Sequence, residues 1–478
     1  MAGLPDVKIE GQITPELRHA LIAAIGGKHG LDQEEAVDLG TGWTDLGRPF
    51  ALVRPASTDE VFRCVKACHA AAVPVVPWGG KTGLVSGACA DNAVAVSLDR
   101  MTGIVEIDPI DCCMVVEAGC TIQTAAEAAE NEGLLLPLDL GSRGSATIGD
   151  TISTNAGGNR VLRFGMMRDM VLGLEAVLAD GTILSSLRPL MKNNTAYDLK
   201  HLFIGAEGTL GIVTRAAIRL RPAFQSRNAA LVSADSFADL ARLLRHVEAG
   251  LGGQLSAFEA MWPDYYDLVT KPSARNRQIL PHGRAFYALI EAMGSDFDAD
   301  YQRFEQTLAQ AMEQGLVSDA VIAQSEADVA AMWAVREDGE QVSQLSPYVA
   351  LDVSLRLSRI AQFVTRLDAL LEGSWPGTRK AIFGHVGDGN LHLVIEASDS
   401  SEHQNEITKA VFELVGELDG SISAEHGIGR DKREYLHFSR SPEEIQAMWK
   451  IKRALDPLNL MNPGKTLPPA DALAENGA

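Results

Sequence analysis

The run from Phe383 to His392, Phe-Gly-His-Val-Gly-Asp-Gly-Asn-Leu-His, restricts the possible folds of this chain more than any other stretch. An Asp-Gly pair between two strand-like runs predicts a β-hairpin, because both residues of a two-residue turn must accept a positive φ. With Asp388 and Gly389 at the turn, residue 385 pairs with 392. His385 and His392 are then cross-strand neighbours about 5 Å apart, and two imidazoles at that spacing can bind one metal ion.

The alternative for this hairpin is one histidine in the core and one on the surface. For a single histidine that alternative is the better interpretation, but two histidines facing each other across a tight turn favour a metal. Asp388 and Asn390 are assigned to the turn rather than to the metal.

A third metal ligand is expected from the motif Ser421-Ile-Ser-Ala-Glu-His-Gly-Ile-Gly429. Its adjacent residues Glu425 and His426 point in different directions and can take different roles. One carboxylate and two imidazoles leave an open coordination position, as in catalytic zinc sites. His426 is then available as a proton acceptor. The alternative is a capping glutamate followed by an ordinary turn histidine.

Length and charge restrict the class of protein. A chain of 478 residues is expected to hold at least two domains. Its formal net charge of −21 argues against nucleic-acid binding, which needs a basic surface. There is no apolar run long enough to cross a membrane, and the start shows no signal peptide. Cys64 and Cys68 would share one helix face and resemble half a metal site, but no second pair of cysteines has zinc-like spacing. The six cysteines therefore suggest reduced thiols and a cytoplasmic location.

Two glycine-rich stretches in the first half suggest a binding site for an extended ligand. Residues 78–88 follow a short strand, and their glycines let backbone N–H groups approach a phosphate. The segment has neither the G-x-G-x-x-G motif of a dinucleotide-binding fold nor the Gly-Lys-Ser/Thr motif of a P-loop. A plain tight loop explains this segment equally well. Small and hydroxyl residues dominate residues 134–158 without helical or strand periodicity, and structureless loops of this length are usually functional.

The second half of the chain has a different pattern. After Pro222, strand-like runs at 229–233, 254–260, 285–292, 317–323 and 349–355 are separated by helical patterns at 236–250, 298–314, 325–337 and 357–372. Helices at 404–418 and 442–455 follow. This alternation predicts an α+β cap domain with a mainly antiparallel sheet.

Six segments together resemble the FAD-linked dehydrogenases of D-2-hydroxy acids, which belong to the vanillyl-alcohol-oxidase-type flavoprotein superfamily. This family includes D-lactate, glycolate and D-2-hydroxyglutarate dehydrogenases. The similarity runs from about residue 45 to 466, and its motifs occur in the family's order at 78–88, 137–158, 203–213, 383–392, 423–427 and 462–465.

The resemblance implies a PCMH-type FAD-binding domain (45–223), a substrate or cap domain (224–420) and a C-terminal helical segment that returns to the flavin (421–466). The residue pattern outside it predicts an N-terminal helical segment (1–44) and a disordered tail (467–478). FAD is expected to be non-covalent, because the loop at 79–87 has no histidine to carry it. The implied FAD-binding residues are Pro77, Gly79, Gly80, Lys81, Thr82, Gly83, Leu84, Gly87, Pro137, Leu138, Asp139, Gly141, Ser142, Gly144, Thr147, Ile148, Gly149, Thr154, Asn155, Ala156, Gly158, Glu207, Gly208, Gly211, Ile212 and Asn462.

The resemblance also implies roles in the reaction. His385, His392 and Glu425 correspond to the family's metal ligands for Zn²⁺ or Mn²⁺, and His426 to the catalytic base that also binds substrate. Arg336 corresponds to an arginine that binds the substrate carboxylate, which suits a planar bidentate donor. A surface salt bridge with a neighbouring glutamate is the competing interpretation of Arg336.

The substrate is the least determined part. Family members that act on 2-hydroxyglutarate add polar or basic groups for the distal carboxylate, and the corresponding positions here hold Glu340, Ala350 and Val394. A D-lactate-like substrate is therefore favoured over 2-hydroxyglutarate. The sequence is also compatible with an NADPH-dependent reductase on the same fold and with a non-enzymatic metal- or flavin-binding module. Expected partners are an electron acceptor such as an electron-transfer flavoprotein, a quinone or a cytochrome, and a second copy in a homodimer.

Overall fold

The computed structural model describes residues 13–26, 29–32, 42–271 and 274–470, which form two compact units. The first contains residues up to 158, 166–223 and those from 425 onward; the second contains 159–165 and 224–424. Residues 1–12, 27–28 and 33–41 of the expected N-terminal segment, and 471–478 of the expected disordered tail, lie outside the described residues.

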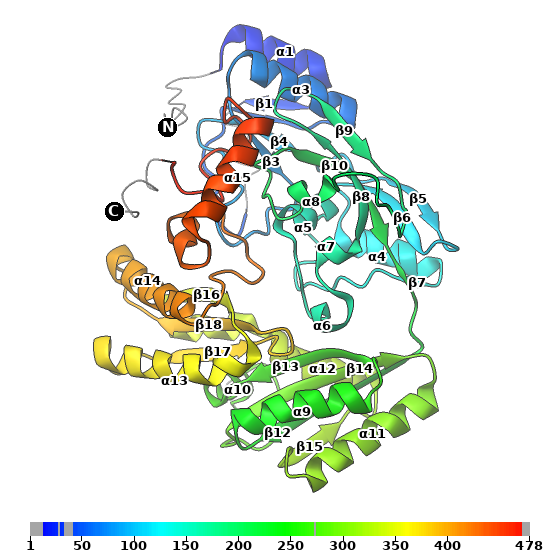
Figure 1. The fold of residues 1–478 in the computed structure, drawn as a ribbon, viewed down its shortest axis with the longest axis vertical. Helices are drawn as coiled ribbons and strands as arrows, with labels where there is room; N and C mark the ends of the chain where they lie inside the picture. The colour runs from blue at the N-terminus through cyan, green and yellow to red at the C-terminus, as the bar shows by residue number, and fades with distance from the viewer. Residues whose placement is uncertain (1–12, 27–28, 33–41, 272–273, 471–478) are drawn as a thin grey trace. The chain divides into compact units, whose positions relative to one another are not determined.

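The first unit begins with a four-stranded sheet in the order β1-β2-β4-β3; Figure 1 labels β1, β3 and β4. Strands β2 (Ala51–Val53), β4 (Val94–Ser97) and β3 (Val75–Trp78) are parallel, and β1 (Gly30–Asp32) pairs antiparallel with β2. Helix α1 (Pro15–Ile25) and helix α3 (Thr58–Ala70) pack on each other. The Ser57 hydroxyl caps α3 by accepting the Glu60 N–H.

A second sheet of this unit has five antiparallel strands in the order β5-β6-β10-β8-β9. Its central strand, β10, is paired on both sides, with β6 and with β8. The strand bounds are β5 (Ile104–Asp108), β6 (Cys113–Glu117), β10 (Ile212–Arg219), β8 (Val171–Val177) and β9 (Ile183–Ser186); a two-stranded sheet joins β7 (Leu134–Leu135) to β11 (Arg221–Pro222). The remaining helices among the described residues of this unit are α4 (Ile122–Asn131), α5 (Ile148–Thr154), α7 (Met167–Met170), α8 (Lys200–Phe203), η2 (Arg433–Phe438) and α15 (Pro442–Leu455).

The structure corrects one expectation in this unit. The small-residue stretch at 134–158 is not structureless, because it contains helix α5. Thr147 and Asp150 form a capping box at its start, in which each side chain accepts the other residue's backbone N–H. Asn155 ends the helix in the left-handed conformation, with φ 50°. A helix this short gives no periodic signal, so only its capping residues could have revealed it.

The second unit is built on one seven-stranded antiparallel sheet, in the order β15-β12-β14-β13-β17-β18-β16. The predicted antiparallel cap sheet is therefore confirmed. Its strands are β15 (Asp319–Ile322), β12 (Ser226–Ala234), β14 (Phe286–Gly294), β13 (Leu255–Met261), β17 (Lys380–Gly384), β18 (Asn390–Glu396) and β16 (Tyr348–Ser354).

Helices of the second unit cover this sheet. Helices α10 (Pro263–Thr270) and α12 (Glu326–Glu337) contribute Tyr265, Met332 and Val335 to a buried cluster that also holds Met261 of β13. Helix α9 (Phe237–Gly250) contacts β12, β13 and β14, and helix α14 (Ser401–Glu417) packs on β16. The other helices are α6 (Val161–Phe164), α11 (Phe297–Glu313), η1 (Gly339–Leu345) and α13 (Leu357–Ser374).

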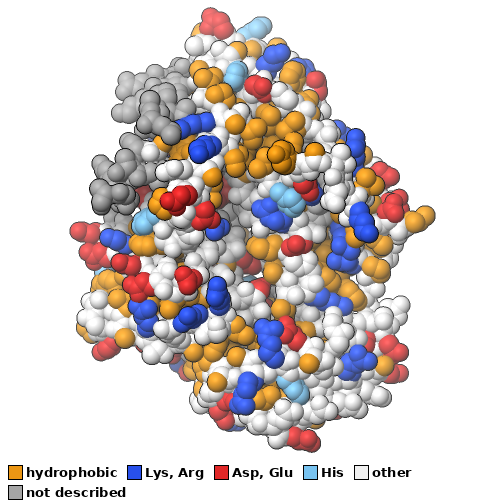
Figure 2. Space-filling view, in the orientation of Figure 1, with side chains coloured by type: hydrophobic (Ala, Val, Ile, Leu, Met, Phe, Trp, Pro, Cys, Tyr) orange, Lys and Arg blue, Asp and Glu red, His pale blue; other side chains and the backbone are white. Residues whose placement is uncertain are grey.

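Among the described residues, no helix has the length and apolar composition needed to cross a membrane. On the face drawn in Figure 2, Lys and Arg side chains are scattered among Asp and Glu rather than gathered in one stripe.

Candidate active site

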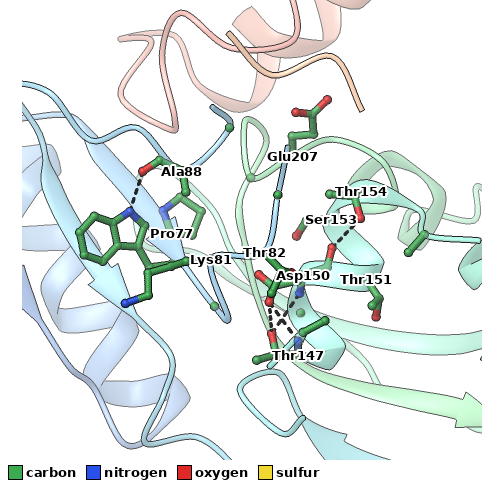
Figure 3. Close-up of a pocket in the computed structure, with 18 of the residues that line it drawn as sticks. Pro77, Lys81, Thr82, Ala88, Thr147, Asp150, Thr151, Ser153, Thr154 and Glu207 are labelled. Atoms are coloured by element: carbon green, nitrogen blue, oxygen red, sulfur yellow. Dashed lines mark hydrogen bonds between the residues drawn. The ribbon is translucent and has the colours of Figure 1, made fainter. Parts of the chain in front are cut away.

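The first unit contains a cavity of about 370 Å³, within the range of cofactor and ligand sites. Its walls come from the glycine-rich loop after β3, from helix α5 and from the turn before β10, as Figure 3 shows. Glu425, His426 and Asn462 complete the lining from the C-terminal part of the chain. Segments far apart in the sequence therefore meet around one space.

Most of the residues expected to bind FAD line this cavity: Pro77, Gly79, Lys81, Thr82, Gly83, Leu84, Gly87, Gly141, Ser142, Thr147, Gly149, Thr154, Ala156, Glu207, Gly208, Gly211, Ile212 and Asn462. The others are not part of its lining: Gly80, Pro137, Leu138, Asp139, Gly144, Ile148, Asn155 and Gly158. Trp43 and Thr44, which the sequence did not suggest, line it as well.

Asp150 positions the glycine-rich loop, a role that sequence reasoning missed. Its Oδ2 accepts the backbone N–H of Gly80 at 2.6 Å. The same oxygen accepts the backbone N–H and the hydroxyl of Thr147, at 3.0 and 2.8 Å (Figure 3). Burial raises the pKa of this carboxyl, although those hydrogen bonds oppose the shift. The capping carboxylate of α5 thus also holds the loop that forms the opposite wall.

Gly80 shows why this loop needs glycine. A Cβ at Gly80 would lie 1.9 Å from the backbone oxygen of Ser145, and one at Gly79 would lie 2.2 Å from Asp150. Gly158, at φ +111°, would place a Cβ 2.2 Å from the Asp139 oxygen. Glycine is required at Gly80 and Gly158 because backbone segments are in direct contact there, and at Gly79 because the Asp150 carboxylate lies against it.

Glu207 connects the turn before β10 to the C-terminal segment. Its carboxylate oxygens accept the N–H groups of Ile428 and Gly429, both at 2.8 Å, while the Asn462 amide donates to its backbone oxygen at 2.7 Å. Burial raises the pKa of this carboxyl, and the two N–H donors act in the opposite direction. Glu207 therefore fixes the chain just after Glu425 and His426.

Glu425 and His426 lie in the lining of the same cavity. Glu425 Oε1 accepts the backbone N–H of Gly158 at 2.9 Å, so the carboxylate also holds the Asn-Ala-Gly-Gly segment that ends there. No pattern in the sequence indicates this contact. His426 therefore lines the same cavity as most of the residues expected to bind FAD.

The hairpin in the second unit has a different register from the predicted one. Phe383, not His385, pairs with His392, and residues 385–389 form a five-residue connection. Backbone bonds inside the loop explain the difference, because both Asp388 N–H and Asn390 N–H donate to the His385 oxygen. A shift of two residues keeps each side chain on its original face. The two imidazole rings are 5.4 Å apart between centroids.

A buried carboxylate supports His385. Its Nδ1 lies 2.8 Å from Glu259 Oε1, and Glu259 is 1 % exposed. An ionised carboxylate can only accept, so His385 Nδ1 donates in this hydrogen bond. Burial favours a higher pKa for Glu259, but the charges of His385 and Arg336 outweigh it and lower the pKa.

Arg336 shares this carboxylate. Its Nε donates to Glu259 Oε2 at 2.8 Å, its guanidinium lies 5.0 Å from the ring centre of Phe383, and only 5 % of the residue is exposed. Arg336 therefore forms a buried pair rather than the surface salt bridge considered from the sequence. Its Nη2 lies 3.5 Å from His385 Nε2. The arginine therefore lies beside the sheet face that carries His385 and His392, which we call the histidine face.

Asp352 lies next to the second histidine. It pairs with His392 across β16 and β18, is fully buried, and its Oδ1 is 4.0 Å from His392 Nδ1. The other oxygen, Oδ2, accepts the Ala424 N–H at 3.0 Å. Asp352 thus supports the histidine face and fixes the chain that precedes Glu425.

Glu259 and Asp352 were both missed from the sequence, although each left a signal. Each is the single charged residue in an otherwise apolar or small-residue strand, Leu255–Met261 and Tyr348–Ser354. A carboxylate in such a strand is rarely buried without a partner. Counting acids in apolar strands would have found both.

Of the three positions used to judge the substrate, only Val394 is buried. It is 4 % exposed, two residues past His392, and belongs to the same apolar cluster as Val335 and Leu345. Ala350 pairs with Val394 across β16 and β18. Glu340 lies in η1, where its carboxylate is bonded to Arg275 and both side chains are mostly exposed.

Known protein families match both halves of the chain. The model of an FAD binding domain matches residues 49–186, and that of the C-terminal domain of FAD-linked oxidases matches residues 224–466. A probable mitochondrial D-2-hydroxyglutarate dehydrogenase from Oryza sativa subsp. japonica is 41 % identical over 428 residues, which is 88 % of this chain and 76 % of the relative. This chain belongs to the FAD-linked D-2-hydroxy acid dehydrogenase family. The enzyme is a flavoprotein dehydrogenase of the D-2-hydroxyglutarate dehydrogenase type.

Other relatives agree with this assignment. The D-2-hydroxyglutarate dehydrogenase of Xanthomonas citri pv. viticola is 39 % identical and covers 90 % of the enzyme and 91 % of its own length. p-Cresol methylhydroxylase, solved with substrate bound, has a TM-score of 0.75 at 16 % identity and covers 97 % of the enzyme and 98 % of its own chain. That structural likeness shows the fold and confirms the expected PCMH-type architecture.

The cavity suits the FAD that this family binds. Its lining combines close-packed glycines, hydroxyl side chains and a neighbouring buried carboxylate that holds the loop in place. FAD bound there would supply the isoalloxazine ring as hydride acceptor. The chain's own contribution is to hold His426 at that cavity through Glu207 and to hold the loop through Asp150.

Proposed function

We propose that the enzyme oxidises a D-2-hydroxy acid with a neutral or apolar side chain, such as D-lactate, and that it does so with a divalent metal. The observation that supports a metal site is the histidine face of the second unit, where Glu259 lies beside His385 and Asp352 beside His392. Metal-binding histidines are typically oriented by a carboxylate in this way.

The proposed ligands are His385, His392 and Glu425, with Zn²⁺ or Mn²⁺ as the ion. A metal bound there would act as a Lewis acid on the substrate and lower the pKa of its hydroxyl. In this proposal Arg336 binds the substrate carboxylate, which suits a guanidinium already oriented by Glu259. His426 removes the hydroxyl proton, a contribution of about 10²–10⁴-fold for a general base.

The proposed preference for a substrate with a neutral or apolar side chain is based on Val394 and the apolar residues around it. A second carboxylate on the substrate would need a polar or cationic partner, and burying it against this apolar cluster would cost free energy. The relatives named as D-2-hydroxyglutarate dehydrogenases make that dicarboxylate the main competing substrate. Comparing kcat/KM for D-lactate and D-2-hydroxyglutarate decides between them, and a strong preference for the dicarboxylate would reject the D-lactate proposal.

An NADPH-dependent reductase on the same fold is the second candidate. It offers no reason for two carboxylate-supported histidines, and rapid reduction of the flavin by NADPH would be needed to support it.

The proposal also includes non-covalent attachment of FAD, a cytoplasmic location and a homodimer. The proposed electron acceptor is an electron-transfer flavoprotein, a quinone or a cytochrome. Release of the yellow cofactor on acid precipitation would support non-covalent binding.

The central experiment is anaerobic bleaching of the flavin by D-lactate, with and without a chelator. His426→Ala is expected to keep FAD and metal but lose bleaching, whereas His392→Ala is expected to lose metal first. His19→Ala, on the exposed surface of α1, is the matched control and should change neither quantity. Full metal content and activity in His392→Ala would show that the metal assignment is wrong.

A further inference from the structure

Asn390 carries a buried carboxamide that has no hydrogen-bond partner among the described residues. The residue is 4 % exposed, and neither Nδ2 nor Oδ1 is bonded, although its backbone N–H contacts Asp388 Oδ1 and the His385 oxygen at 3.2 Å. Each buried polar group without a partner costs about 1–3 kcal/mol. The backbone at Asn390 thus takes part in the turn, as expected, but the carboxamide does not.

The position of Asn390 places this carboxamide on the histidine face. It is the first residue of β18 and two residues before His392, so both side chains leave the same face of the sheet. Its neighbour across the sheet is Ser354, and Asp352 lies opposite His392. The other face of β18 is apolar, because Leu391 and Leu393 alternate with these residues and are fully buried.

A carboxamide matches the polar end of a 2-hydroxy acid. It offers two N–H donors and one acceptor, and a 2-hydroxy carboxylate offers carboxylate oxygens and a hydroxyl. On the basis of the proposed function, we propose that Asn390 is a further substrate-binding residue, whose Nδ2 donates to an oxygen of the substrate's 2-hydroxy carboxylate. Arg336 and Asn390 then share recognition of that group, one through charge and one through a neutral amide.

Asn390→Leu is the decisive variant, because leucine has a similar volume and no polar atoms. Replacing an unpaired buried amide by an apolar group should leave the melting temperature of the substrate-free enzyme unchanged or raise it. KM for D-lactate should rise about tenfold or more, as expected when a hydrogen bond to a charged group is lost. The thermal shift produced by D-lactate under anaerobic conditions should fall in parallel, while FAD and metal content stay at wild-type values.

Two other variants complete the test. Asn390→Asp keeps the size and removes the donors, and its carboxylate repels that of the substrate, so its KM should rise even if the leucine variant fails to fold. Asn228→Leu changes another buried asparagine of the same sheet, in β12, and should leave KM for D-lactate unchanged.

The outcomes separate this inference from the proposed function. If D-lactate fails to bleach the wild-type enzyme, the substrate proposal is wrong, and the same variants are measured with whichever D-2-hydroxy acid does bleach it. An unchanged KM and thermal shift in both Asn390 variants would overturn the inference. Loss of FAD from Asn390→Leu, with KM unchanged in the fraction that retains it, would overturn it as well and assign the amide to the cofactor.

Discussion

The cavity of the first unit and the histidine face of the second are built from different parts of the chain. Around the cavity, backbone groups are in direct contact, so that a single added methyl group at Gly80 would meet a backbone oxygen at 1.9 Å. On the histidine face, side chains are arranged by buried charge, with Glu259 between His385 and Arg336. The first kind of site depends on steric fit and the second on electrostatics, so different substitutions should damage each one.

Gly80→Ala should have the largest effect on the cavity. The new Cβ meets the backbone of Ser145, which cannot move as a flexible side chain would. FAD affinity should fall by at least about tenfold, equal to 1.4 kcal/mol, as measured by titrating apoprotein with FAD. Gly373→Ala, at a helical glycine whose Cβ would meet nothing within 4 Å, is the control. Equal FAD affinity in both variants would show that the close packing at Gly80 is not required.

Glu259→Gln should damage the histidine face and leave the cavity intact. The neutral amide no longer supports His385 or balances Arg336, and loss of such a carboxylate typically costs about 10–100-fold in metal affinity or activity. Metal content after dialysis, kcat/KM and FAD content measure the effect.

The control for this substitution is Glu175→Gln, which removes a buried carboxylate bonded to Arg215 in the first unit. It should lower stability without selective loss of metal. If Glu259→Gln binds metal as tightly as the wild type, the carboxylate support of His385 has no role in metal binding.

Glu340→Ala should have the smallest effect and should change substrate preference. Removing Glu340 leaves Arg275 without the carboxylate that neutralises it, and so adds one positive charge to this surface. Exposed pairs contribute about 0.2–1 kcal/mol, so the ratio of kcat/KM for D-2-hydroxyglutarate to that for D-lactate should rise by only about two- to fivefold. Glu402→Ala, an exposed acid on α14, makes the same change of net charge elsewhere. An equal change of ratio in both variants would make the effect one of overall charge.

The two sites also differ in how well the sequence predicted them. Most of the expected FAD residues line the cavity, since glycines and hydroxyl residues in a fixed order are a local signal. Helix α5 was missed because seven residues are too few to show periodicity. On the histidine face the two histidines were predicted to be neighbours, but the register was two residues off, because backbone bonds within residues 385–389 lengthen the connection.

The sequence by itself determined the family, the antiparallel sheet of the second unit and the residues to consider at each site, because turn, capping and glycine signals are local along the chain. Only the tertiary structure decided which buried charged residues hold those site residues in place. Asp150 holds a loop seventy positions away, Glu259 reaches His385 across β13 and β17, and Asp352 fixes the residues before Glu425. These contacts join segments that are distant in sequence, and the free energy that orients each side chain comes from partners that no local pattern contains.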